Sequence, residues 1–336
     1  MENHYLSLCC IIKDEENIEE FILYYTILGV TKFYIYDNES KIPLKERLNS
    51  FYYNHYCTII DFPGKGRQMD AYNHCLKNYG HLTKWLIIAD GDEYILPKTT
   101  YTLTELLKDH EEKHAIGINW VFFGTSFHNN KQNGFLVDNY RRCQNKQDDH
   151  IKIIVQPAFT NYINNPHFGD FHDSSKFMDI KNNIITRYAW NSNYTTDIIQ
   201  INHYFCKSLE ESINKFYRGN ADNTVRVKSD ESIHYFANDT IDNYLPNKYL
   251  NSIKKRYFIT CVNFSIYRAL NNDIIFNNDE EIKNHILSYA EKENRPLHIH
   301  DKFPEFNRSE YRKQNPQFDN KDDVYLEINY IIQNIK

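Results

Sequence analysis

Short apolar segments alternate with amphipathic segments from residue 5 to residue 123, and this alternation constrains the fold more than any other feature of the sequence. Runs of apolar residues predict strands at residues 5–12, 32–37, 57–61, 85–90 and 115–123. Between them, apolar residues at helical spacing predict a helix from Ile18 to Gly29 and another from Gln68 to Tyr79. Strands that alternate with helices form a mostly parallel sheet, so we expect an α/β, Rossmann-like fold with flanking helices.

The middle of the chain departs from this rhythm. Residues 124–185 are polar and irregular, and we expect them to form loops over one edge of the sheet. Residues 198–206 alternate like a further strand. Ser208 and Glu211 then form the capping-box pattern that starts a helix.

The last hundred or so residues show only helical periodicity, near residues 280–292 and 322–335. We therefore expect one α/β domain over residues 1–235 and a mainly helical C-terminal extension over residues 236–336. No internal repeat is visible.

Composition argues against several classes of protein. The 336 residues are 41% hydrophobic, enough for a substantial core, and the net charge of −6 argues against a nucleic-acid binder. The seven cysteines have no CxxC spacing, which argues against a zinc knuckle or a disulfide framework. The longest apolar run, at residues 21–30, is too short to span a bilayer, and the N-terminus has no signal-peptide pattern. We expect a bacterial or viral-host cytoplasmic location, no secretion and no transmembrane segment.

Polar residues gather at the ends of the predicted parallel strands. They are Lys13, Asp14 and Glu15, then Asp37 and Asn38, then Asp61, and finally Asp90, Gly91 and Asp92. The carboxyl ends of parallel strands share one edge of a sheet, and ligands bind there in open α/β sheets. Several acidic strand ends at one edge predict a site for a metal ion and a nucleotide.

The strongest single signal is Asp90-Gly91-Asp92, directly after a continuous apolar strand. A divalent metal bound to a diphosphate takes hard oxygen ligands, and the glycine lets the diphosphate approach the backbone. His203 could add a neutral imidazole ligand, and Lys207 could neutralise a leaving diphosphate. Each also has an ordinary interpretation: a surface turn, a structural histidine and an exposed lysine at a helix start.

Five segments in this order resemble glycosyltransferase family 92 and its family-2-like relatives, over about residues 5–225. They are "CCIIKDEENIEEFILYYTILGVTKFYIYDNES" (9–40), "QMDAYNHCL" (68–76), "WLIIADGDEYI" (85–95), "WVFFGTSFH" (120–128) and "INHYFCKSLEESINKFYRGNAD" (201–222). The resemblance implies a GT-A-like fold and an inverting, metal-dependent glycosyltransferase. It further implies Mn²⁺ or Mg²⁺ as cofactor, a nucleoside-diphosphate sugar (a UDP-sugar) as donor, and a glycan or glycoconjugate as acceptor.

The same resemblance assigns roles to individual positions. Asp90 and Asp92 become the DxD pair, and His203 the late metal ligand. The donor-binding set is Lys13, Asp14, Glu15, Asp37, Asn38, Gln68, Asn73, Asp90, Gly91 and Lys207. Lys152 and His167 are further candidates, in a segment (150–168) that follows the family pattern loosely. This chain has Glu93-Tyr94 where the family motif usually continues into Phe.

An inverting transfer also needs a general base to accept the proton of the acceptor hydroxyl. Besides Asp92 as a catalytic group, the candidates for the base are His128, Asp170, Asp173 and Asp222. The sequence does not choose among these candidates.

Two other functions compete. A metal-dependent nucleotidyltransferase would use a similar sheet, but it should carry a Gly-rich, basic loop after its first strand, where this chain has Asp14 and Glu15. A non-catalytic carbohydrate-binding protein on the same fold could lose the metal carboxylates, whereas both Asp90 and Asp92 are present.

Overall fold

The computed structural model describes residues 3–218, 239–243, 245–290 and 292–334. The chain divides into two compact units. The first consists of Met1–Asn49 and Tyr56–Ile253, and the second of Ser50–His55 and Lys254–Lys336. The domain boundary predicted at 235/236 lies outside the described residues.

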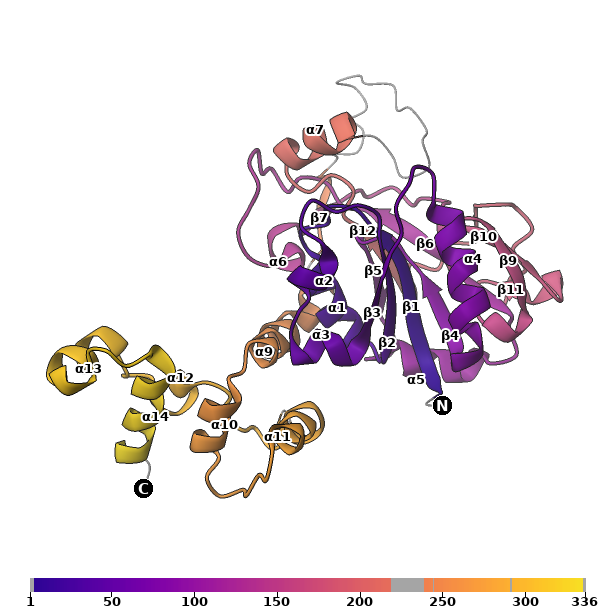
Figure 1. The fold of residues 1–336 in the computed structure, drawn as a ribbon. Helices are drawn as coiled ribbons and strands as arrows, with labels where there is room; N and C mark the ends of the chain where they lie inside the picture. The colour runs from indigo at the N-terminus through magenta and orange to yellow at the C-terminus, as the bar shows by residue number, and fades with distance from the viewer. Residues whose placement is uncertain (1–2, 219–238, 244, 291, 335–336) are drawn as a thin grey trace. The chain divides into compact units, whose positions relative to one another are not determined.

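The first unit is built on one mixed sheet with helices on its faces (Figure 1). Among the described residues its nine strands are β1 (His4–Ile12), β2 (Lys32–Asp37), β3 (Cys57–Asp61), β4 (Thr83–Ile88), β5 (Glu93–Pro97), β6 (Ala115–Phe122), β8 (Ile151–Val155), β11 (Phe177–Met178) and β12 (Ile199–His203). Two small sheets pair β9 (Thr160–Asn165) with β10 (Phe168–Phe171), and β7 (Arg142–Cys143) with β13 (Ile241–Asp242).

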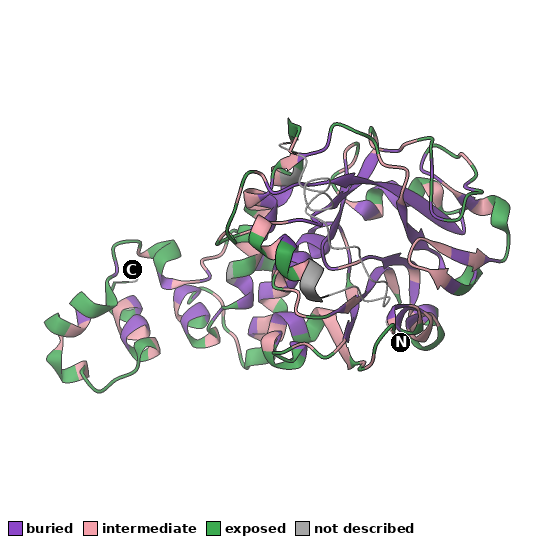
Figure 2. Cartoon of the chain, turned by 90° about the horizontal axis from the view of Figure 1, so that it is seen from above, coloured by how far each residue is buried: buried purple, intermediate pink, exposed green. Residues whose placement is uncertain are grey.

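The main sheet is mostly parallel, which confirms the predicted α/β fold. Its strand order is β3-β2-β1-β4-β8-β6-β12-β5, with β11 paired to β6. β8 and β5 are antiparallel to their neighbours, and the other pairings are parallel. Figure 2 shows most strands of the main sheet buried, whereas the edge strand β3 is of intermediate exposure and the exposed residues lie mainly on helices and loops.

Helices pack on both faces of this sheet, as expected for a chain that winds in both directions from β1. The helices of the first unit are α1 (Ile18–Ile27), α2 (Leu44–Arg47), α4 (Gln68–Tyr79), α5 (Leu103–Leu107), α6 (Leu136–Asn139) and α7 (Leu209–Arg218). The 3-10 turns are η1 (Gly80–Leu82), η2 (Lys108–His110), η3 (Pro157–Phe159), η4 (Ser174–Lys176) and η5 (Leu245–Tyr249).

Local signals explain where these helices start and stop. Gly29 has a φ of +99°, a conformation that glycine adopts without strain, and it ends the α1 segment as predicted. The capping box of Ser208 and Glu211 is present: each backbone N–H donates to the other residue's side chain, at 3.0 and 3.2 Å. Ala71, Tyr72 and Cys75 of α4 pack in one core cluster with alternate residues of the strands.

Two predictions about elements need correction. Residues 124–185 are not loops alone, since they contain β8, near the middle of the sheet, and the β9–β10 hairpin. Lys152 interrupts the apolar run of β8, so the pattern of a buried strand was hidden. β5 was not predicted as a separate strand. Only a short segment separates Glu93–Pro97 from β4, and its first residue is charged, so no separate apolar run was visible there.

The second unit is helical. Its helices are α3 (Phe51–Tyr56), α9 (Leu250–Thr260), in which the division between the units falls, α10 (Phe264–Leu270), α11 (Asp279–His285), α12 (Ile299–Lys302), α13 (Arg308–Gln314) and α14 (Asp323–Asn334), with the π-turn η6 (Ile286–Ala290) and the 3-10 turn η7 (Pro316–Phe318). Its core includes Ile266, Leu270, Ile299 and Leu326. The helices predicted near 280–292 and 322–335 are confirmed. No helix among the described residues is long and apolar enough to cross a membrane.

Candidate active site

The Asp90-Gly91-Asp92 tripeptide follows β4 at the carboxyl edge of the parallel strands. β4 lies between β1 and β8, so the tripeptide is near the middle of this edge. A Cβ on Gly91 would lie 2.7 Å from Cδ1 of Ile12 and 3.0 Å from Cγ of Glu15. The absence of a side chain at Gly91 therefore lets the tripeptide pack closely against the end of β1.

Three donors hold the Asp90 carboxylate. Oδ1 accepts hydrogen bonds from Nε2 of Gln68 at 2.8 Å and from the Tyr72 hydroxyl at 3.1 Å, and Oδ2 accepts one from Nζ of Lys152 at 2.8 Å. Burial raises the pKa of Asp90, but the charge and the hydrogen bond of Lys152 act together against burial, and that pKa is lowered overall. Burial also opposes the charge on Lys152. Asp90 and Glu93 act against burial and raise the pKa of Lys152 overall; the Glu93 carboxyl group lies 3.5 Å from its Nζ. Asp90 is thus a positioned anion with both oxygens in use.

Asp92 faces a histidine and a lysine. Its Oδ1 lies 3.6 Å from Nε2 of His203, and its Oδ2 accepts a hydrogen bond from Nζ of Lys215 at 2.5 Å. Burial raises the pKa of Asp92, but the charge and hydrogen bond of Lys215, together with the charge of Lys207, act against burial; the pKa is lowered overall, so Asp92 is ionised.

His203 is held as a neutral imidazole. Burial lowers its pKa to about 4, and its ring packs against the rings of Trp120 and Phe122 at centroid distances of 4.5 and 5.0 Å. Its buried Nδ1 has no hydrogen-bond partner among the described residues. A neutral imidazole whose Nε2 faces an ionised carboxylate can serve as a metal ligand.

These contacts show which of the predicted metal ligands have the geometry to hold an ion. Asp92 and His203 present a carboxylate oxygen and an imidazole nitrogen close together, and they fit a divalent ion. Asp90 does not offer a free oxygen in this arrangement. Among the residues that the structure describes, no three His, Cys, Asp or Glu side chains group to hold an ion. Asp92 and His203 are therefore the two predicted ligands, among the described residues, that could hold an ion, and further positions would fall to the phosphates of a bound donor and to water.

A second, partly buried ion pair joins the segment after β1 to the segment before α7. Nζ of Lys207 donates to Oε1 of Glu15 at 2.5 Å and to Oδ1 of Asn17 at 3.1 Å. Burial opposes the charge on Lys207, but the charge and hydrogen bond of Glu15, with the charge of Asp92, raise the pKa of the ammonium overall. The predicted donor residues Glu15 and Lys207 therefore lie together, beside Gly91.

Other predicted donor residues shape the loops at this edge. Both carboxylate oxygens of Asp37 accept backbone N–H groups, those of Ser40 at 3.0 Å and Leu44 at 2.8 Å. The Asn38 amide donates to two carbonyls in the segment after β3, at 2.8 Å each. Asp14 accepts the N–H of Lys41 at 2.7 Å. These side chains close turns, so their predicted contact with a nucleotide stays a prediction.

Lys13 and Asn73 complete the predicted donor set. Lys13 is exposed at the end of β1. The Asn73 amide bonds both to the N–H and to the carbonyl of Ile163, at 2.8 Å each, and so ties α4 to β9. Gln68, on the same helix, is the predicted donor residue that reaches Asp90 directly.

The candidates for the general base are scattered. His128 contacts the carbonyl of Asn139 at 3.1 Å through Nε2. Asp170 lies on the β9–β10 hairpin and accepts from Asn161, and Asp173 caps η4. Asp222 lies outside the described residues.

The structure adds residues that sequence reasoning missed. Trp120 of β6 packs against His203, Lys215 of α7 pairs with Asp92, and His150, just before β8, pairs with Asp148 and stacks on Trp120. The available signal was the spacing of His150 and Lys152, since side chains two residues apart on a strand share a face.

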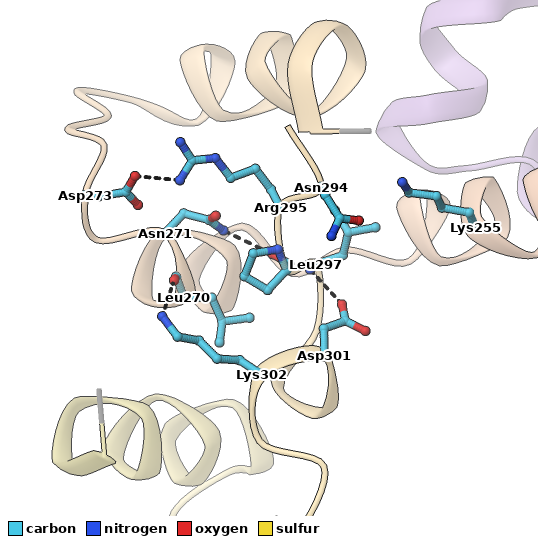
Figure 3. Close-up of a pocket in the computed structure, with 10 residues that line it drawn as sticks. Lys255, Leu270, Asn271, Asp273, Asn294, Arg295, Leu297, Asp301 and Lys302 are labelled. Carbon is cyan, nitrogen blue, oxygen red and sulfur yellow. Dashed lines mark hydrogen bonds and ion pairs between the residues drawn. The ribbon is translucent and has the colours of Figure 1, made fainter. Parts of the chain in front are cut away.

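A cavity of about 500 Å³ lies elsewhere, lined entirely by residues of the second unit (Figure 3). Several of its polar groups already hold that unit together. Arg295 pairs with Asp273 at 2.6 Å, Asp301 accepts the N–H of Leu297 at 2.7 Å, and Lys302 donates to the carbonyl of Leu270 at 3.4 Å. We assign no part of the chemistry at Asp92 to this cavity.

Comparison with known proteins identifies the family. Residues 4–234 match the model of glycosyltransferase family 92. A glycosyltransferase family 92 protein of Oryza sativa subsp. japonica is 25% identical over 184 residues, covering 53% of this chain and 31% of that protein. The beta-1,4-galactosyltransferase galt-1 of Caenorhabditis elegans is 30% identical over 115 residues, covering 31% of this chain and 27% of that protein. The chain thus spans about a third of the length of these curated relatives.

Among solved structures, S. aureus TarS 1-349 in complex with UDP is similar over 46% of this chain and 47% of that chain. Its TM-score is 0.30 and its identity 12%, too low for a functional argument. The family match covers more than half of the chain and includes the Asp90-Gly91-Asp92 edge and His203. The chain therefore belongs to glycosyltransferase family 92.

Proposed function

We propose that this protein transfers a sugar from a nucleoside-diphosphate sugar to a hydroxyl group of a glycan or glycoconjugate, with inversion at the anomeric carbon. The donor is a UDP-sugar, and a galactosyl donor is the first to test because one relative is named a galactosyltransferase. Family membership supports the reaction class. The observation that carries the proposal is the ionised Asp92 facing the neutral His203 at the carboxyl edge of the sheet.

In this proposal Asp92 and His203 hold a divalent metal ion. An imidazole ligand favours Mn²⁺ over Mg²⁺, because Mg²⁺ prefers an all-oxygen, octahedral shell. Such an ion stabilises the negative charge that develops on the leaving diphosphate. Lys215, which now pairs with Asp92 at 2.5 Å, would have to release this carboxylate to a bound ion, and its ammonium could then help to neutralise the diphosphate. Asp90, fixed by Lys152, Gln68 and Tyr72, acts on the donor through a ribose hydroxyl or a water molecule.

A donor screen tests this function. The full chain is incubated with Mn²⁺ and a panel of UDP-, GDP- and CMP-sugars, and released nucleotide is measured with and without oligosaccharide acceptors. We expect UDP release, with UDP-galactose as the first donor, and tighter calorimetric binding of UDP than of GDP in Mn²⁺. Pyrophosphate release from a nucleoside triphosphate and a sugar phosphate would instead show a nucleotidyltransferase. Glycan binding with no turnover of any donor would show a binding protein.

A further inference from the structure

We propose that His150 is the general base of the transfer reaction and that Asp148 is its positioning residue. This inference rests on the proposed glycosyltransferase function and names the group that accepts the proton of the acceptor hydroxyl. β8 lies between β4 and β6 and runs antiparallel to both. The first residues of β8 therefore lie at the same edge as the last residues of β4 and β6.

The side chain of His150 lies on the active-site face of this edge. His150 is two residues before Lys152, whose ammonium contacts Asp90 at 2.8 Å, and alternate strand residues share a face. The N–H of Trp120 donates to the His150 carbonyl at 3.0 Å. The two rings stack at a centroid distance of 5.3 Å and an angle of 18°. Trp120 in turn contacts the ring of His203 at 4.5 Å, so a single indole separates the imidazole of His150 from the candidate metal ligand.

The hydrogen bonds of His150 suit a base. Its Nδ1 lies 2.8 Å from Oδ1 of Asp148, which also accepts the His150 backbone N–H at 2.8 Å. A carboxylate at Nδ1 fixes the tautomer in which Nε2 carries the free lone pair. Among the described residues Nε2 has no hydrogen-bond partner, and 42% of the side chain is exposed. The other neighbouring rings are those of His167 at 6.3 Å and Trp190 at 5.8 Å.

Among the described residues, the other candidates for the base are less well arranged. Nε2 of His128 is engaged by a carbonyl, and Asp170 and Asp173 serve the hairpin and η4. In the proposed step the acceptor oxygen forms a bond to the anomeric carbon, and the bond from that carbon to the donor phosphate breaks. The diphosphate leaves with the electron pair, and the hydroxyl proton passes to Nε2 of His150.

The experiment measures UDP-galactose turnover with Mn²⁺ and an acceptor that the wild type uses, together with calorimetric affinity for UDP and Mn²⁺. General-base catalysis typically contributes about 10²–10⁴-fold. We therefore expect His150→Ala to lower kcat about 10²-fold or more, with UDP affinity unchanged. Added imidazole should restore part of the rate, because the site is open to solvent. His150→Phe keeps the stack on Trp120, and it should lose as much activity as His150→Ala without rescue by imidazole. His81→Ala, at an exposed histidine of η1, should behave as the wild type.

The positioning role of Asp148 has its own readout. Asp148→Asn should lower kcat rather than raise KM, and it should cost nothing further in a His150→Ala background, because residues that act as one unit are not additive. Full activity in His150→Phe would overturn the proposal. The proposal would also be overturned if the lower turnover of His150→Ala were accounted for by weaker binding of UDP. A wild type that neither binds UDP nor turns over any donor would refute the proposed function itself and this base with it.

Discussion

At the scale of single residues, Asp92 is the carboxylate on which the proposed chemistry depends most. Asp92→Asn keeps the size of the side chain but removes the charge that faces His203 and Lys215. If metal stabilisation of the leaving diphosphate supplies several kcal/mol, turnover should fall by about 10² or more. The measurement is kcat with UDP-galactose across a Mn²⁺ titration.

Asp70→Asn is the matched control for this substitution. Asp70 is 62% exposed on α4 and pairs with Arg67 one turn away. Its loss should leave turnover within about twofold of the wild type, because this exposed pair makes no contact with Asp92 and contributes only about 0–1 kcal/mol to stability. Equal turnover in Asp92→Asn and Asp70→Asn would contradict the role of Asp92.

Lys152 is the residue whose loss should cost the most stability at this edge. Its side chain is 2% exposed and lies between the carboxylates of Asp90 and Glu93. Lys152→Met leaves these acids without their cation, and breaking a buried pair costs about 3–5 kcal/mol. Urea unfolding measures the loss.

Lys181→Met provides the comparison, since Lys181 pairs with Asp197 at 2.7 Å on the surface. A surface pair of this kind is worth about 0–1 kcal/mol. If both variants lost the same small amount, Lys152 would not be the electrostatic support of Asp90 that we describe.

At the scale of elements, one carboxyl group of α1 holds α6. Glu20 is 5% exposed and accepts the backbone N–H groups of Leu136 and Val137, at 2.6 and 3.0 Å. Burial raises its pKa to about 7, although these two hydrogen bonds oppose the shift.

This raised pKa predicts a pH dependence of stability. In the unfolded chain Glu20 ionises at its ordinary value of 4.5, so the folded state binds the proton more tightly between pH 4.5 and about 7. The free energy of unfolding should therefore fall as pH rises through this window, by up to about 3 kcal/mol. In Glu20→Gln the free energy of unfolding should fall less over this pH window. Any change in stability from the substitution that does not depend on pH leaves this comparison of slopes unaffected. Urea unfolding from pH 4.5 to 8 measures both slopes. Glu112→Gln, at an exposed site, should keep the wild-type slope, and an unchanged slope in Glu20→Gln would refute the assignment.

Some strands could be predicted from the spacing of their apolar residues, and others could not. β1, β2, β4 and α4 were predictable because each has a complete apolar pattern of its own. β8 was not, because its apolar run contains Lys152, and a lysine in a buried strand is explained only by the acids of another strand. The same charge that hid the strand places a cation at the active site.

At the scale of the whole molecule, each of the two units has its own apolar core. Leu326 of α14 is fully buried in the cluster of the second unit. Leu326→Ala should destabilise that unit by about 2–5 kcal/mol through the cavity it leaves. We expect faster amide hydrogen exchange in α10 and α14, with protection of β1 and β4 and donor turnover at the wild-type level.

Ile332→Ala, on the same helix but 66% exposed, is the control and should leave exchange unchanged. Faster exchange across β1 and β4 in Leu326→Ala would show that the two cores unfold together.

The sequence by itself determined the α/β class, most of the parallel strands and the position of Asp90-Gly91-Asp92 at a strand end. Those features follow from patterns that neighbouring residues carry, namely strand and helix periodicity and polar residues where a buried strand stops. The predicted ligands Asp92 and His203 came from this reasoning and from the family resemblance, and the structure brings them within 3.6 Å.

Only the tertiary structure decided how the site is completed. The insertion of β8 between β4 and β6 brings Lys152 to Asp90 across 62 residues of sequence, and it places His150 beside Trp120. No local pattern encodes such a pairing, because the partner that stabilises each buried charge lies on a distant strand. The polar residues at the strand ends could therefore be predicted from the sequence. The residues that hold these side chains in place could not, because they depend on which strands become neighbours in the sheet.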